Sequence, residues 1–179
     1  PALIYVLPLF YASLGVVFIY LIGERLHGPK LGLTAAALTV LFPQMAQTGS
    51  QLWPSVFQFA FLSAAVFCVL VWLERPRSTL PLVLAAAAYI LAWAARETAA
   101  YFFPGLLLLV WLPSRSWRGL AVFCLASGLM AGAEWLYFWL DTGSILGRLG
   151  ITTRVLEEQN PKTLAGYLLN FLNYGKLRG

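Results

Sequence analysis

Charged residues are scarce in this chain of 179 residues, and the residues of several common catalytic sites are scarcer still. Lys, Arg, Asp and Glu make up 11% of the sequence, against about 25% in an average soluble domain. Histidine occurs once, as His27, and aspartate once, as Asp141. There is no His/Cys cluster for zinc, no Ser/His/Asp set and no glycine-rich phosphate loop. The sequence therefore argues against a zinc site, a serine hydrolase and a P-loop enzyme.

Cysteine is also rare, and Cys68 and Cys124 both lie within apolar runs. A free cysteine in such a run is most often a small buried hydrophobic residue. Their spacing fits neither a disulfide framework nor a metal motif. We expect no metal site built from these residues.

Apolar residues, in contrast, make up 60% of the chain, against about 45–50% in an average soluble domain. The polar residues are too few to cover that apolar surface, so lipid is the expected solvent. A helix needs about 20 apolar residues to cross the hydrocarbon, and continuous runs disfavour a β-barrel. The sequence predicts an all-α, multi-pass membrane protein. Long windows without any charge support this prediction, among them 1–23, 31–73, 79–95 and 119–133.

Charge, proline and glycine divide these runs into six expected spans, 2–22, 31–42, 52–73, 80–95, 98–112 and 119–140. The first and second are separated by "GERLHGPK", which is expected to form a short charged loop. The second, fourth and fifth spans are short, and Pro104 should bend the fifth. Short and bent spans suggest that their outer ends line a cavity, because irregular backbone at membrane depth must be covered by protein or water.

Basic residues alternate between the two sides of this layout. The loops after the first, third and fifth spans hold six of them, whereas those after the second and fourth hold only Arg96. Short basic loops favour the cytoplasm. We therefore expect Arg96 and the region after Asp141 to face outward. The six cytoplasmic residues are Arg25, Lys30, Arg75, Arg77, Arg115 and Arg118. They account for the net charge of +5 without any nucleic acid.

The composition changes after the sixth span. Residues 141–179 hold five of the twelve basic and three of the seven acidic residues. Asn160 followed by Pro161 is a typical helix start, and Leu164, Leu168 and Phe171 then share one face. We predict a membrane-embedded bundle over 1–140 and an outward segment over 141–179, with a helix near 161–174 on the lipid surface. The sequence opens inside an apolar run and stops at "NYGKLRG" without a clear terminus, so it is interpreted as an internal piece of a longer protein.

Arg96 and Glu97 are the first candidate site, because they interrupt the apolar run "AYILAWAARETAAYFFPG". One interpretation is an outer turn in which the pair neutralises itself. The other is an anion site, since a charge at membrane depth is costly unless paired or hydrated and a guanidinium can bond two phosphate oxygens. Glu134 is the second anomaly, about 9 Å below the outer end of its span. It is expected either to interact with Arg96 or to reach up to the interface.

The turn "FPQMAQTGSQLWPS" is the third candidate region. Gln47, Gln51 and Ser55 offer amides and a hydroxyl that suit sugar hydroxyls, and Trp53 offers an aromatic face for a sugar ring. The same residues equally suit a wet membrane interface, where tryptophan is enriched.

Two stretches show a resemblance to a known family. They are "YLIGERLHGPKLGLTAAALTVLFPQMAQTGSQLWPSVFQFAFLSAAVFCVLVWLERP" and "LAWAARETAAYFFPGLLLLVWL". The region 12–140 resembles the bacterial GT-C membrane glycosyltransferases of the protein O-mannosyltransferase-like and aminoarabinose-transferase-like type. Members share a basic turn with Gly-Pro, a small-residue-rich span ending near Phe-Pro, a long span, and a short basic element between two later spans.

The resemblance implies transfer of a sugar from a polyprenyl-phosphate donor on the outer face of the inner membrane of a bacterial cell envelope. Arg96 matches the basic element and would hold the donor phosphate. The family's catalytic carboxylate usually lies in an earlier external loop, so no catalytic residue is assigned here. Pro54 stands where many members carry an acid, which puts metal or acceptor handling in question and leaves a divalent cation open.

Two other functions are compatible with the sequence. The chain could be a non-catalytic accessory subunit that packs against other proteins of a larger membrane complex. It could also be a transporter or lipid flippase, although such proteins often show internal repeats and a polar path to both faces, and neither is evident here.

Overall fold

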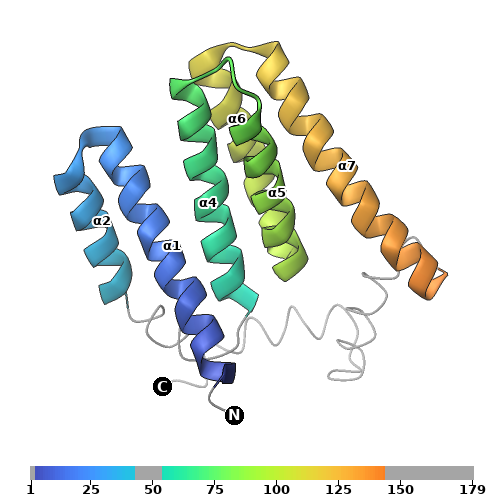
Figure 1. The fold of residues 1–179 in the computed structure, drawn as a ribbon, viewed down its shortest axis with the longest axis horizontal. Helices are drawn as coiled ribbons and strands as arrows, with labels where there is room; N and C mark the ends of the chain where they lie inside the picture. The colour runs from blue at the N-terminus through green and yellow to red at the C-terminus, as the bar shows by residue number, and fades with distance from the viewer. Residues whose placement is uncertain (1–2, 43–53, 144–179) are drawn as a thin grey trace, which may run out of the picture. The chain divides into compact units, whose positions relative to one another are not determined.

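The computed structural model describes residues 3–42 and 54–143, and every regular element in these ranges is helical (Figure 1). Four segments are long and apolar enough to cross a membrane: Val6–His27, Pro54–Glu74, Glu97–Ser114 and Trp117–Asp141. Two shorter apolar helices accompany them. The prediction of an all-α, multi-pass membrane protein is confirmed. The elements are α1 (Leu3–His27), α2 (Pro29–Leu41), α4 (Pro54–Glu74), α5 (Leu80–Ala95), the 3₁₀ helix η1 (Glu97–Phe102), α6 (Phe103–Ser114) and α7 (Trp117–Thr142).

The turn between α1 and α2 is shorter than predicted. The loop expected at "GERLHGPK" is wrong, since α1 continues through Glu24 and Arg25 to His27, leaving only Gly28 between the helices. Gly28 has a φ of 92°, which glycine adopts without steric cost, and its N–H closes α1 on the carbonyl of Glu24 at 2.7 Å. Pro29 then opens α2 at a position where its missing N–H is not needed.

The irregularity in the fifth span also lies earlier than predicted. Pro104 was expected to bend this span, but it is the second residue of α6 and helps to start that helix. The change of helix type occurs just before it, where η1 gives way to α6 at Phe103.

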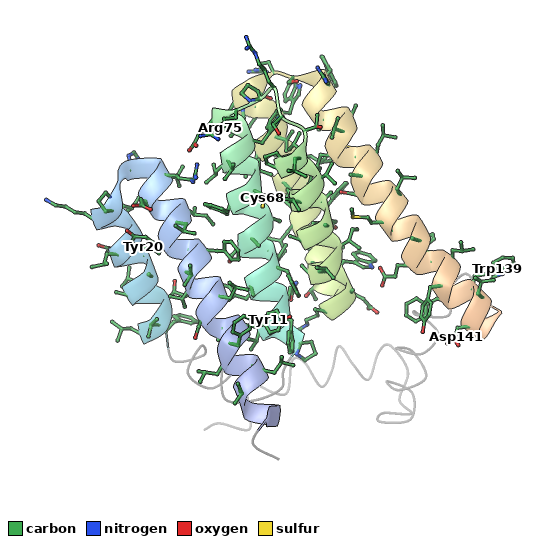
Figure 2. All side chains as sticks on the ribbon, viewed as in Figure 1. Tyr11, Tyr20, Cys68, Arg75, Trp139 and Asp141 are labelled. Atoms are coloured by element: carbon green, nitrogen blue, oxygen red, sulfur yellow. The ribbon has the colours of Figure 1, made fainter. Side chains whose placement is uncertain are left out.

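The chain divides into two compact units, residues 1–131 and 132–179, so that α7 crosses the boundary. The described part of the second unit is the end of α7, which carries Trp139 and Asp141 (Figure 2). The surface helix expected near 161–174 lies outside the described residues. The division into 1–140 and 141–179 stays a prediction.

In the first unit, α4 packs against α1 on one side and against α5 on the other (Figure 1). The α1–α4 contact is aromatic, with the Tyr11 ring edge-on to Phe57 at 4.8 Å and tilted against Phe61 at 5.4 Å. The core between α4, α5, α6 and α7 mixes alanines with large side chains. Small residues let helix backbones approach closely in lipid. Its buried members are Ala65, Val69, Trp72, Leu82, Ala85, Ala86, Tyr89, Leu106, Val110 and Phe123.

The helices α1 and α2 touch through glycine. A Cβ atom on Gly32 would lie 2.6 Å from the carbonyl oxygen of Tyr20 and 2.9 Å from the amide nitrogen of Glu24. A Cβ atom on Gly23 would lie 2.7 Å from the Cα of Gly32. Backbone therefore meets backbone at this crossing, and no side chain fits between the two helices.

The basic turns of the first unit gather at one end. Arg25 at the end of α1 forms a salt bridge with Glu74 at the end of α4, which brings those two helix ends together. Figure 1 shows the α4–α5 and α6–α7 turns at that end, whereas the break after α5 lies at the opposite end. This arrangement is the one that the alternation of basic residues predicts. Which end faces the cytoplasm stays a prediction.

Candidate functional site

The site is built around a single extended residue between two helices. The helix α5 ends at Ala95, and Arg96 follows with φ −159° and ψ 129°. The Arg96 N–H still donates to the carbonyl of Ala92 at 3.0 Å, and the Arg96 carbonyl accepts from Ala99 at 3.0 Å to begin η1. The chain therefore reverses direction at Arg96, and Figure 1 shows α6 returning beside α5.

The side chain of Arg96 reaches the start of α4. Its Nη1 donates to Ser55 Oγ at 2.6 Å, and Ser55 lies in the first turn of that helix. A guanidinium has five N–H donors in a planar fork. One bond to Ser55 still leaves the Nε and Nη2 side able to bind an anion through two oxygens. The Arg96 side chain is exposed, so an anion from outside can approach it.

A second contact between side chains, from Gln58 of α4 to Thr98 of η1, holds the same turn. Gln58 Nε2 lies 3.0 Å from Thr98 Oγ1, and the Thr98 hydroxyl lies 3.2 Å from Gln58 Oε1. Gln58 is only 8% exposed. Because it follows Ser55 by three residues, both side chains project from the same face of α4. The start of α4 thus holds the 96–98 turn at two points, and we call Ser55, Gln58, Arg96 and Thr98 the polar cluster.

The structure does not bring all predicted site residues together. Arg96 belongs to the polar cluster, and Glu97 follows it as the first, partly exposed residue of η1. Glu134 lies on α7 within the second unit and is partly exposed, so its predicted interaction with Arg96 stays a prediction. Gln47, Gln51 and Trp53 lie outside the described residues.

Gln58 and Thr98 are absent from the predicted site, although one signal could have found Gln58. It is an amide within the span predicted over 52–73, which is otherwise almost wholly apolar. A buried amide in lipid needs a partner, because the cost of an unpaired polar group there is several kcal/mol. Thr98 gave no such signal, since a threonine after a charged pair is unremarkable in sequence.

Metal-binding residues do not gather near the polar cluster. Within residues 3–42 and 54–143, no group of three His, Cys, Asp or Glu side chains could hold a metal ion. The polar cluster itself offers a cation and neutral hydrogen-bonding groups, which suit an anionic or hydroxyl-rich ligand.

We expect substitutions of Gln58 and Thr98 to be coupled in their effects on the free energy of unfolding. Gln58→Leu or Thr98→Val alone should destabilise the protein by about 1–3 kcal/mol, since the first leaves the partly buried Thr98 hydroxyl unsatisfied and the second the buried Gln58 amide. The double variant should lose less than the sum, with a coupling energy of about 1 kcal/mol. Thermal unfolding of the purified protein in detergent measures this. Ser13→Ala serves as the control, because the Ser13 hydroxyl bonds only within its own helix at an exposed site. Strictly additive losses would show that the pair does not act as a unit.

Comparison with known proteins agrees with the resemblance seen in the sequence. The family model for dolichyl-phosphate-mannose-protein mannosyltransferase matches residues 2–137, which include every helix of the first unit and the polar cluster. No curated protein and no solved structure matches the chain. On the family match, this chain belongs to the dolichyl-phosphate-mannose-protein mannosyltransferase family of membrane glycosyltransferases, which is of the GT-C type.

Proposed function

We propose that this chain forms part of a glycosyltransferase that takes a sugar from a polyprenyl-phosphate donor at the outer face of a cell's inner membrane. Arg96 binds the donor phosphate in this proposal. The observation that supports it is the arginine of the polar cluster, held by Ser55 at 2.6 Å and lying at the end of the first unit away from the other basic turns.

The chemistry of such a donor calls for a cation at its phosphate. When the bond between the sugar carbon and the phosphate oxygen breaks, the leaving polyprenyl phosphate gains negative charge. A fixed guanidinium stabilises that developing charge without reorganising. Arginine suits the task better than lysine because its planar fork can bond two phosphate oxygens at once. Ser55 fixes one edge of the fork and leaves the other to the donor.

The name of the family supports mannose as the sugar and a protein as the acceptor. We propose both for this chain, with a side-chain hydroxyl of the acceptor as the attacking group. A carboxylate would take the proton from that hydroxyl as general base. The catalytic residue is left unassigned among Glu97, Glu134, Asp141 and residues outside this chain. The family match favours this function over a transporter or flippase.

Donor choice tests the proposal. Membrane vesicles from cells that express the full-length protein would receive either radiolabelled mannosyl phosphoryl polyprenol or a radiolabelled nucleotide sugar. We expect label to enter acceptor from the lipid-linked donor and not from the nucleotide sugar, relative to vesicles from cells that lack the gene. Incorporation from the nucleotide sugar alone, with the lipid-linked donor inert, would contradict the proposal.

A further inference from the structure

Four arginines lie at the end of the first unit opposite the polar cluster. Arg75 and Arg77 belong to the α4–α5 turn, and Arg115 and Arg118 flank the start of α7. All four side chains are exposed, and Figure 2 shows Arg75 at the end of α4. We call these four residues the arginine rim.

The two turns that carry the arginine rim are neighbours in space. Gly119, in the first turn of α7, packs against Trp72, and a Cβ atom there would lie 2.5 Å from the indole ring. Trp72 is 1% exposed and lies two residues before the end of α4. The start of α7 therefore rests on the end of α4, which places both pairs of arginines along one edge.

The positive charge of this edge is not cancelled by the acids beside it. Glu74 forms its salt bridge with Arg25 of α1. Glu24 keeps its negative charge, but the two acids at this end are outnumbered by six basic residues. Among the residues that the structure describes, no ion pair involves an arginine of the rim. The rim is thus left with a net excess of positive charge.

The backbone at the start of α5 adds a partial positive charge to that of the arginine rim. The helix α5 begins at Leu80, three residues after Arg77, and within the described part of the chain no side chain caps its first N–H groups. The start of a helix carries a partial positive charge and attracts anions. The start of α7 is instead capped, because Ser116 Oγ accepts from the Gly119 N–H at 3.1 Å. The α4–α5 turn is therefore the stronger half of the rim.

Tryptophan fixes the depth of the rim relative to lipid. The Arg115 guanidinium lies over the Trp111 ring at 4.7 Å, and the rings of Trp111 and Trp117 are 6.0 Å apart. Trp117 is 71% exposed. Indole rings settle at the level of the lipid headgroups. We therefore expect Arg115, over the Trp111 ring, and Arg118, next to Trp117 in sequence, to lie at the level of the lipid phosphates.

We propose that the arginine rim is a binding site for anionic phospholipids, distinct from the polar cluster at the other end of the unit. The ligand is the phosphate of the headgroup, held by the guanidinium forks and the start of α5, with the acyl chains along the apolar helices. The Trp111–Trp117 pair favours a membrane lipid over a soluble anion, because indole rings are enriched at headgroup depth and a site beside them faces lipid phosphates. Each arginine near an anionic surface strengthens binding about fivefold.

Lipid titration of the purified full-length protein tests this site. The protein would be placed in phosphatidylcholine nanodiscs containing increasing fractions of phosphatidylglycerol with brominated chains, and quenching of tryptophan fluorescence would report binding. We expect saturable quenching that brominated phosphatidylcholine does not reproduce. Arg77→Gln and Arg118→Gln should each weaken binding by more than about fivefold, which is the loss expected from removing any basic residue near an anionic surface. The double variant should lose more than about 25-fold. Lys30→Gln is the matched control and should lose no more than about fivefold, since Lys30 is exposed in the first turn of α2 and outside the rim.

Three results would overturn the proposal. An equal loss in Lys30→Gln would mean that the charge acts diffusely and that the rim is no site. Equal quenching by the two lipids would remove the preference for anionic headgroups. Displacement of the lipid by millimolar glycerol phosphate or by an acidic peptide would identify a site for soluble anions. All three substitutions concern exposed side chains, and unchanged thermal unfolding confirms that the variants are folded.

Discussion

Arg96→Ala is expected to lower sugar transfer about 100- to 1,000-fold, which is the range measured when one preorganised group that stabilises a developing negative charge is removed. Arg96→Lys should lose about tenfold or more, because an ammonium keeps the charge but cannot bond two phosphate oxygens in one plane. Ser55→Ala should have a smaller effect, since it removes the bond that orients the guanidinium and leaves the guanidinium in place. The rate of mannose transfer from the lipid-linked donor measures all three.

Donor affinity separates a role in binding from a structural role for Arg96. If the arginine holds the phosphate, a short-chain polyprenyl phosphate should bind the Arg96→Ala protein more weakly, while its thermal unfolding remains near that of the parent. Lys30→Ala is the control at the opposite end of the unit and should transfer sugar at the parental rate. Full transfer activity in Arg96→Ala would remove Arg96 from the site.

Gly32→Ala is expected to destabilise the protein by about 1–3 kcal/mol, and Gly32→Val by more, which is the usual range for overpacking of a close contact. The added Cβ would lie 2.6 and 2.9 Å from the backbone of Tyr20 and Glu24. Backbone atoms cannot rotate away as a flexible side chain can, so α1 and α2 would have to separate. Thermal or chemical unfolding in detergent, with matched protein and detergent concentrations, measures the change.

Gly128→Ala provides the control for this contact. A Cβ atom there meets nothing within 4 Å among the described atoms, and alanine favours a helix over glycine by about 1 kcal/mol. Its stability should stay equal or rise. If Gly32→Ala were as stable as the parent, the close crossing of α1 and α2 would be incorrect.

The hydropathy pattern predicted the helices well, because in lipid every backbone polar group must be paired within its own segment. The start of α5 at residue 80 and its end at residue 95 agree with the predicted span. The α1–α2 turn was missed because charge was interpreted as the end of a helix. Arg25 remains helical since its guanidinium has partners on α4, the Glu74 carboxylate and, at 4.9 Å, the Phe67 ring. Partners on another helix are not visible in the local sequence.

The candidate site was predicted only in part, for a similar reason. Arg96 stands out in sequence because it is a charge within an apolar run. Its contact with Ser55 and the contact of Gln58 with Thr98 join residues about 40 positions apart. Both depend on the register between α4 and α5, which follows from the packing of alanines and large side chains in the core and not from any single motif.

The most direct test of the account is the sidedness of the two ends in intact cells. Cys68 and Cys124 would be replaced by alanine, and a single cysteine introduced either at Ser78, in the basic α4–α5 turn, or at Pro54, beside Ser55; both positions are exposed. A membrane-impermeant maleimide should label the Pro54→Cys protein in intact cells and the Ser78→Cys protein only after the membrane is opened. Labelling of both from outside, or of Ser78→Cys alone, would contradict an outward-facing Arg96 and the function proposed for it.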